Sequence, residues 1–349
     1  MSKEARTEIE SLGEFGLIKL LTDNNKTNND TTVKAIGDDA AVLRSGDHLK
    51  LLSTDMLLEG VHFDLSYVPL KHLGYKAVVV NLSDIYAMNG SAKQITVSIA
   101  ISNRFSVEAI EELYSGIYLA CTNYGVDLVG GDTSASRQGL VISVSVIGEV
   151  QEDKVVYRSG AKENDLLVVS GDLGGAYMGL QLLEREKSVY LDNPEIQPDL
   201  DGNDYVLERQ LKPEARIDIV DLLNEMGVVP TSMIDISDGL ASEVIHLCDQ
   251  SGLGANVYDE KIPIDPMTYQ RARDFELDPG VVALNGGEDY ELLFTVKRSD
   301  FDKIKGNPNL SVIGHMQNKE AGIHLIAKNG TQHELSAQGW DAFLKQKRS

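Results

Sequence analysis

The spacing of apolar and polar residues predicts a mixed set of helices and strands in the first 150 residues. Residues 69–88 carry apolar side chains at helical spacing and are apolar enough to form a largely buried helix. Residues 107–124 have the pattern of an amphipathic helix, whereas 95–101 and 140–150 alternate as strands do. Further apolar runs predict a helix over 8–22 and strands over 33–43, 49–55 and 126–129.

The charged, glycine-containing segment 151–162 predicts a connection between two domains. We therefore expect an amino-terminal domain over 1–150 and a carboxyl-terminal domain over 151–349. Beyond the connection, the pattern predicts a buried strand over 165–170, a helix that reaches residue 183 and an acidic loop over 188–204, followed by alternating helix and strand signals. Because these elements mix without regular β-α-β spacing, they indicate an α+β fold rather than a doubly wound sheet.

Composition narrows the possible partners. The chain has 349 residues, with 32 Lys and Arg against 54 Asp and Glu, so its formal net charge is -22. This charge argues against nucleic acid or an anionic membrane as a partner. Two cysteines without a C-x-x-C pattern indicate neither a zinc site nor a disulfide framework. The amino terminus lacks the apolar core of a signal peptide, and no apolar run is long enough to span a bilayer, so we expect a cytoplasmic protein.

Candidate chemistry lies in five short segments that combine carboxylates with small or hydroxyl-bearing residues. Four of them are expected to end apolar strands, whereas Asp84 lies on the apolar helix over 69–88. The segments are Gly37-Asp38-Asp39, Ser53-Thr54-Asp55, Asn81-Leu82-Ser83-Asp84, Gly130-Gly131-Asp132 and Asp235-Ile236-Ser237-Asp238.

Each segment also has a purely structural explanation. Asp238 precedes a helical pattern and suits a helix N-cap, and Asp55 and Asp132 suit local turns. Asp84 and Asp235 are harder to explain this way, since each lies among apolar residues where an unpaired charge is costly. Converging carboxylates raise one another's pKa unless cations neutralise them. Clustered Mg²⁺, which commonly serves phosphates, would explain the whole set.

Other motifs give weaker signals. The glycine-rich stretch over 169–175 follows a strand and opens a helix, so it could bind an anion or form only a tight turn. P-loop, Rossmann and protein-kinase signatures are absent from the sequence. His62 follows the Ser53-Thr54-Asp55 segment closely enough to face the same pocket, although a lone histidine is more often structural. Trp340, the single tryptophan, is either a core residue or a stacking partner for a flat ring.

Taken in order, the motifs closely resemble the thiamine-monophosphate kinase family of the aminoimidazole-ribonucleotide-synthetase-like superfamily, over residues 11–345. The segments that carry the resemblance, in addition to the acidic ones, are Gly13-Glu14-Phe15, Gly60-Val61-His62-Phe63, Ala87-Met88, Arg158-Ser159-Gly160-Ala161-Lys162 and Gly286-Gly287-Glu288-Asp289-Tyr290-Glu291-Leu292. The chain departs from the family pattern at Asn89, where a glycine is more usual, and in its longer loop over 188–204.

The resemblance implies ATP-dependent, Mg²⁺-dependent phosphorylation of thiamine monophosphate to thiamine diphosphate by direct in-line transfer. It also implies a homodimer that pairs its amino-terminal sheets, and a carboxyl-terminal α/β domain that closes over the site. Carried over residue by residue, it implies Mg²⁺ ligands at Asp38, Ser53, Thr54, Asp55, Asp84, Asp132, Asp235 and Asp238, of which Asp55, Asp84 and Asp235 are expected to be catalytic. It further implies ATP contacts at Tyr114, Gly131, Asp132, Arg158 and Ser237, and substrate contacts at His62, Glu288 and Trp340.

Two alternatives remain at this point. One is a sibling enzyme of the same superfamily, such as selenophosphate synthetase, the cyclo-ligase itself or a hydrogenase-maturation dehydratase. Selenophosphate synthetase carries a reactive residue near its amino end and the maturation protein a carboxyl-terminal cysteine, whereas here the first cysteine is Cys121 and the chain ends Lys-Arg-Ser. The other is a non-catalytic protein that binds divalent cations, which would leave the glycine-flanked Glu288 motif and Arg158 unexplained.

Overall fold

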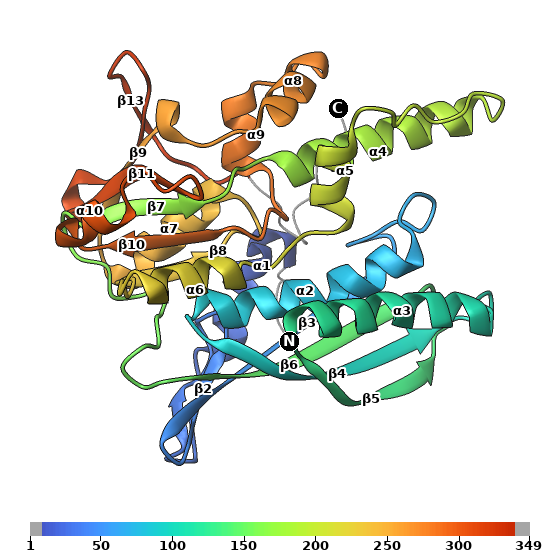
Figure 1. Cartoon of the computed structure of the whole chain (residues 1–349), viewed down its shortest axis with the longest axis horizontal. Helices are drawn as coiled ribbons and strands as arrows, with labels where there is room; N and C mark the ends of the chain where they lie inside the picture. Colours follow the sequence, from blue (N-terminus) through green and yellow to red (C-terminus); the bar gives the residue numbers. More distant parts are fainter. Residues whose placement is uncertain (1–8, 339–349) are drawn as a thin grey trace, which may run out of the picture.

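The computed structural model describes residues 9–338, and within them strands and helices form two mixed sheets with packed helices (Figure 1). The predicted α+β class is confirmed. The helices are α1 (Gly13–Thr22), α2 (Leu70–Ala87), α3 (Val107–Tyr124), α4 (Gly175–Asp192), α5 (Asp204–Leu211), α6 (Ile217–Glu225), α7 (Leu240–Ser251), α8 (Pro266–Asp274), α9 (Pro279–Asn285) and α10 (Phe301–Ile304).

The first sheet has the strand order β1-β2-β3-β6-β4-β5 and is antiparallel except for the pair β4–β5. Its strands are β1 (Thr32–Lys34), β2 (Ala41–Ser45), β3 (His48–Leu58), β4 (Ser91–Ile101), β5 (Asp127–Ala135) and β6 (Val141–Val150). Helices α2 and α3 lie side by side over one face of this sheet (Figure 1).

Glycines let α2 and α3 approach each other backbone to backbone. A Cβ atom on Gly74 of α2 would lie 2.0 Å from the Leu113 carbonyl oxygen, and one on Gly116 of α3 would lie 1.8 Å from the Lys71 carbonyl oxygen. Nearly the whole length of α2 is buried, as its apolar pattern predicts. This helix is therefore fixed on both sides, which matters because it carries Lys76 and Asp84.

The second sheet has the strand order β13-β12-β9-β11-β7-β10-β8. Its strands are β7 (Leu166–Ser170), β8 (Ser232–Asp235), β9 (Gly254–Tyr258), β10 (Leu292–Val296), β11 (Leu310–Gln317), β12 (Ile323–Ile326) and β13 (Gln332–Glu334). Edge strand β8 contacts α2, and one apolar cluster includes Leu82 of α2, Met233 of β8 and Phe294 of β10. The two halves of the chain thus share a continuous core across α2.

Several predicted boundaries are wrong. The strands of the first sheet continue past their polar residues, so Ser53-Thr54-Asp55 lies inside β3 and Gly130-Gly131-Asp132 lies inside β5. Backbone pairing with β6 and β4 carries both strands onward, regardless of side-chain polarity. Conversely, the turn at Gly37-Asp38-Asp39 divides the strand expected over 33–43 into β1 and β2, and α4 extends to Asp192, into the expected loop.

A search of the described residues for a helix with the length and apolar character needed to cross a bilayer finds none.

Candidate active site

Three carboxylates from distant parts of the chain meet between the two sheets. Asp39 precedes β2, Asp84 lies near the end of α2 and Asp235 ends β8, and each has an oxygen within 4.8 Å of the others. We call these three residues the acidic group. Serines orient two of its members: Ser53 Oγ donates to Asp84 Oδ2 at 2.5 Å, and Ser83 Oγ donates to Asp235 Oδ2 at 2.5 Å.

Burial and mutual repulsion raise the pKa values of these carboxyl groups. The pKa of Asp84 lies well above its usual range because burial disfavours its charge, and because Asp55, Asp235 and Asp39 add negative potential. Burial, reinforced by Asp39, raises the pKa of Asp235 to about 7. Because ionised carboxylates are disfavoured at this site by burial and by one another, a bound cation would stabilise them.

Arg158 is the basic side chain bound to the acidic group. Its Nη2 and Nε atoms lie 2.7 and 3.1 Å from Asp39 Oδ1, and its backbone nitrogen donates to Asp38 Oδ1 at 2.9 Å. One arginine does not balance three carboxylates. Among the residues that the structure describes, the buried atoms Asp38 Oδ2 and Asp39 Oδ2 have no hydrogen-bond partner.

The structure separates the two neighbouring aspartates of the Gly37-Asp38-Asp39 turn. Asp39 belongs to the acidic group, whereas Asp38 lies outside it and 3.7 Å from Lys34 Nζ. Burial raises the pKa of Asp38 to about 6. The sequence pattern marked both acids of this turn, and the family resemblance implied only Asp38, because adjacent acids carry the same signal until the side-chain directions are known.

Strand β3 brings Ser53 and Asp55 to the side of α2. The backbone nitrogen of Asp55 donates to Asn81 Oδ1 at 3.0 Å, and crowding by protein atoms raises the pKa of the Asp55 carboxyl although the residue as a whole is solvent-exposed. Because side chains alternate along a strand, Thr54 points to the opposite face, where its Oγ1 donates to the Val144 carbonyl oxygen at 3.0 Å. Its hydroxyl is therefore turned away from the acidic group.

The segment after β8 adds a carboxylate that sequence reasoning missed. Glu243 of α7 is buried, and its Oε1 accepts a hydrogen bond from the Asp238 backbone nitrogen at 3.1 Å. Burial, with Asp238 and Asp235 nearby, raises the pKa of Glu243 well above its usual range. Gly239, with φ 122°, is the N-cap of α7, so the predicted N-cap role of Asp238 is wrong. The sequence could have indicated Glu243, because it is an acid on the apolar face of a helix.

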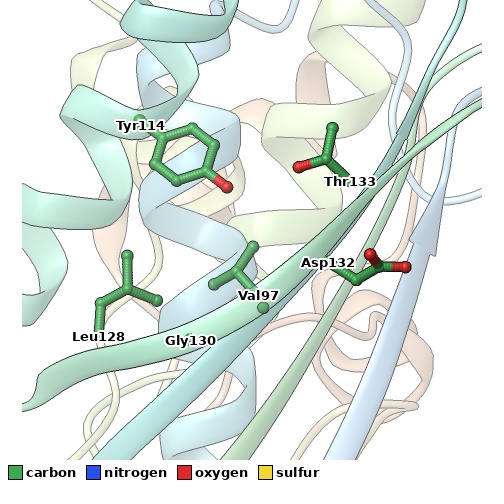
Figure 2. Close-up of a pocket in the computed structure, with 7 residues that line it drawn as sticks. Val97, Tyr114, Leu128, Gly130, Asp132 and Thr133 are labelled. Carbon is green, nitrogen blue, oxygen red and sulfur yellow. The ribbon is translucent and has the colours of Figure 1, made fainter.

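A pocket of about 420 Å³ lies beside edge strand β5 and is open to solvent (Figure 2). Its lining residues come from α3, β4 and β5: Val97, Tyr114, Leu128, Gly130, Gly131, Asp132 and Thr133. The ring of Tyr114 stands over the strands, and the Asp132 carboxylate points away from it (Figure 2). A Cβ atom on Gly131 would lie 1.8 Å from the Val97 carbonyl oxygen, so only glycine allows this close strand pairing.

His62 follows β3 in the first half of the chain, and Glu288 precedes β10 in the second half. His62 Nδ1 accepts a hydrogen bond from the Leu58 backbone nitrogen at 3.0 Å. Burial lowers the pKa of His62, while the charge of Glu288 raises it and the charge of Lys76 lowers it further. Glu288 pairs with Lys76 at 3.0 Å. Trp340, the third predicted substrate residue, lies outside the described residues.

The glycine-rich stretch over 169–175 is satisfied by the protein's own anion. At the start of α4, the backbone nitrogens of Gly174 and Ala176 donate to the Asp289 carboxylate at 2.7 and 3.3 Å. Asp289 is buried and also lies 3.5 Å from Arg209 Nη2. The amides at the start of α4 therefore bind Asp289 of the protein itself rather than an external anion. This contact also holds the segment that carries Glu288.

Family models match both halves of the chain. Residues 37–150 match the model described as AIR synthase related protein, N-terminal domain, and residues 162–326 match the corresponding C-terminal domain. Together with an acidic group between the two sheets, these matches define the chain as an AIR-synthase-related protein.

Full-length relatives narrow this class. The chain is 35% identical to the thiamine-monophosphate kinase of Aquifex aeolicus, over 96% of this chain and 99% of that one, and 30% identical to that of Bacillus subtilis, over 95% and 100%. A solved structure described as AaThiL complexed with AMPPCP and TMP superimposes with a TM-score of 0.82 at 33% identity, covering 97% of this chain and 99% of the other. The chain belongs to the thiamine-monophosphate kinase family.

Proposed function

We propose that this protein uses ATP to phosphorylate thiamine monophosphate, giving thiamine diphosphate and ADP. The observation that carries the proposal is the acidic group, which joins both domains and leaves a buried oxygen of Asp39 without a hydrogen-bond partner within residues 9–338. The relative described as AaThiL complexed with AMPPCP and TMP, which shares 33% identity with this chain, supports the choice of both substrates.

The donor set fits Mg²⁺, which prefers hard oxygen ligands and few carboxylates per ion. We propose that several ions are held by Asp39 together with the ligands expected from the sequence. Those ligands are Asp38, Ser53, Thr54, Asp55, Asp84, Asp132, Asp235 and Asp238. Since the Thr54 side chain faces the other side of β3, its contribution would come from backbone oxygen. When bound, Mg²⁺ supplies charge that screens phosphate repulsion and stabilises the transferring group.

On the nucleotide side, we propose contacts from Tyr114, Gly131, Asp132, Arg158 and Ser237. The pocket beside β5 is where three of these residues meet, and its tyrosine ring offers a flat surface for a base (Figure 2). Arg158 lies at the acidic group rather than in this pocket. In this proposal, the base of ATP contacts the pocket beside β5 and its phosphates lie near Arg158.

On the acceptor side, we propose that His62, Glu288 and Trp340 bind thiamine monophosphate. The nucleophile is an oxygen of the substrate's own phosphate, whose second pKa is about 6, so it is already ionised near neutral pH. A general base is then unnecessary, and His62, with its lowered pKa, serves in binding. Asp55, Asp84 and Asp235 act by holding charge at the point where the two phosphates meet, and transfer is direct.

We propose a homodimer formed through the first sheet, with 1–150 and 151–349 as the two domains. The face of the sheet turned away from α2 exposes Leu52, Met56 and Ile147, and edge strand β5 exposes Val129. Exposed apolar side chains on one sheet favour association.

The test is a measurement of ADP release with ATP and Mg²⁺, comparing thiamine monophosphate, thiamine and no acceptor. We expect turnover only with thiamine monophosphate, and formation of thiamine diphosphate. ADP release that does not depend on thiamine monophosphate would reject the proposal, and turnover with thiamine alone would indicate a salvage kinase or a pyrophosphokinase.

A further inference from the structure

Lys76 reaches from α2 of the first domain into the second domain. Its Nζ lies 3.0 Å from Glu288 Oε1 and 3.1 Å from the Gln210 carbonyl oxygen, at the end of α5. The residue is only 4% exposed. A lysine buried this completely needs close polar partners, and here both partners belong to the other domain.

Three contacts hold Glu288 in place. Its Oε1 pairs with Lys76, its Oε2 accepts a hydrogen bond from Gln210 Nε2 at 2.7 Å, and its backbone nitrogen donates to the Ser237 carbonyl oxygen at 2.7 Å. Its φ of 64° is a conformation that non-glycine residues rarely adopt and that the surroundings must enforce. This much support indicates that the position of the carboxylate matters.

The Lys76 and Glu288 side chains differ in how far solvent reaches them. The Glu288 side chain is 29% exposed, whereas that of Lys76 is 5% exposed. Glu288 is therefore the member of the pair that a bound molecule can reach, whereas the Lys76 side chain is almost entirely covered. Any effect of Lys76 on a ligand must act through Glu288.

We propose that Lys76 is a positioning residue for thiamine monophosphate, which fixes the Glu288 carboxylate from behind with the help of Gln210. This inference rests on the proposed function, since it takes Glu288 as a substrate contact. The same helix carries Asp84 of the acidic group, so α2 sets the distance between the residue that binds the thiamine end and the residues that serve the phosphates.

The first test is steady-state kinetics of Lys76→Met, which keeps the length of the side chain and removes its charge. We expect KM for thiamine monophosphate to rise about tenfold, because a less firmly held Glu288 carboxylate binds the substrate more weakly, while KM for ATP stays the same. Lys76→Arg should recover part of the loss. Combined with Glu288→Gln, Lys76→Met should add no further loss, because both act through one carboxylate.

The matched control is Lys303→Met on α10, far from the site in Figure 1. Lys303 Nζ likewise binds a carboxylate and a backbone carbonyl, at 2.8 Å from Asp300 Oδ1 and 3.0 Å from the Gly227 oxygen. Lys303→Met should leave KM for thiamine monophosphate and KM for ATP unchanged. Should Lys76→Met fail to fold, Gln210→Met removes only the Oε2 support and should raise KM for thiamine monophosphate in the same selective way. Equal rises in both KM values, or independent losses in the double variant, would overturn the inference.

The second test needs no substrate, so it separates this inference from the proposed function. In an NMR titration of the His62 imidazole, assigned with His62→Gln, Lys76→Met should raise the pKa, because a nearby cation is lost and Glu288 is left uncompensated. Glu288 and Glu14 are the other charges that act on this histidine. If the wild-type protein does not turn over thiamine monophosphate, the proposed function fails, yet a raised pKa still supports the link between Lys76 and Glu288. An unmoved pKa overturns that link.

Discussion

Ser83 Oγ on α2 donates a hydrogen bond to Asp235 Oδ2 on β8 at 2.5 Å, across 152 residues of sequence. The bond joins the first domain to the second at the acidic group itself. Ser53 on β3 orients Asp84 in the same way. A hydroxyl from another element therefore orients each of these two carboxylates. Because Asp235 comes from the second domain, the acidic group forms only when the two domains are docked.

Replacing Asp235 with Asn should abolish turnover and leave the fold intact. Removing a metal-binding carboxylate costs charge stabilisation at the transferring group, for which we expect a rate loss of about 1,000-fold. In metal-free buffer the melting temperature should hold or rise, because one repelling charge is gone. Initial rates and thermal unfolding check both effects. Asp302→Asn, at an exposed position on α10, is the control. Near-normal activity of Asp235→Asn at high Mg²⁺ would contradict the metal assignment.

The stability of the metal-free protein should depend on pH through Asp235. Its pKa is raised from 3.8 to about 7 in the folded state, so the folded protein binds this proton more tightly than the unfolded chain. The wild type then loses stability relative to Asp235→Asn as pH rises from 3.8 to about 7, by about 1.4 kcal/mol per unit of pKa difference. Melting temperatures of both proteins in EDTA should diverge over this range and converge when Mg²⁺ is added. A constant difference would argue against a raised pKa.

The two neighbouring aspartates should differ in importance. Asp39→Asn removes an oxygen from the acidic group and breaks the pair with Arg158, so turnover should fall about 100-fold and require more Mg²⁺. Asp38→Asn, outside that group, should have the smaller effect. Mg²⁺ titrations of the rate for both variants decide between them. The reverse order would favour the original choice of Asp38.

Two adjacent glycines of β5 form a matched pair for the pocket. Gly131→Ala places a Cβ atom 1.8 Å from the Val97 carbonyl oxygen, so we expect a loss of about 1–3 kcal/mol in stability and a higher KM for ATP. For Gly130→Ala the nearest contact is Thr96 Cγ2 at 3.8 Å, which is ordinary. Thermal unfolding and ATP kinetics should show the effect only in the first variant. Equal behaviour would mean that the strand pairing relaxes easily.

The segment 59–68, which carries His62, is tied to α4. Lys187 Nζ lies 2.7 Å from Asp64 Oδ2, and Tyr67 donates to Glu184 Oε1 at 2.6 Å. Burial opposes the charge of Asp64, yet hydrogen bonds from Lys187 and Ser66 lower its pKa to about 2, so the Asp64 carboxylate stays ionised and the contact persists at neutral pH.

Lys187→Met should therefore loosen this segment. A partly exposed pair is worth about 1 kcal/mol at most, so KM for thiamine monophosphate should rise up to about fivefold, with KM for ATP unchanged. Lys328→Met, on the surface between β12 and β13, is the control. Kinetics with each substrate varied separately measure the effect. A change in KM for ATP alone would rule out a role of this contact at His62.

The sequence was most informative where local pattern decides structure. The amphipathic pattern over 107–124 coincides with α3, and the buried pattern over 69–88 with α2. Strand ends were harder to predict, because β3 and β5 continue beyond their polar residues through pairing with strands that are distant in sequence. The sequence also showed which segments carry candidate acids. An acid among apolar residues stands out, because burying an unpaired carboxylate is costly.

Which of two adjacent acids joins the acidic group could not be predicted from the sequence. Asp38 and Asp39 differ only in direction, and Arg158, which selects Asp39, lies 119 residues away. Lys76 gave no signal either, because a single lysine in an apolar helix usually extends to solvent along its stem. Its burial depends on Gln210 and Glu288 of the other domain.

The acidic group also bears on how the protein is made. Domains tend to fold in order during synthesis on the ribosome, the amino-terminal one first. A nascent chain that has emerged only as far as β6 carries Asp39 and Asp84 but neither Arg158 nor Asp235. Because Asp235 ends β8, about two thirds of the way along the chain, the acidic group is complete only after translation has passed β8.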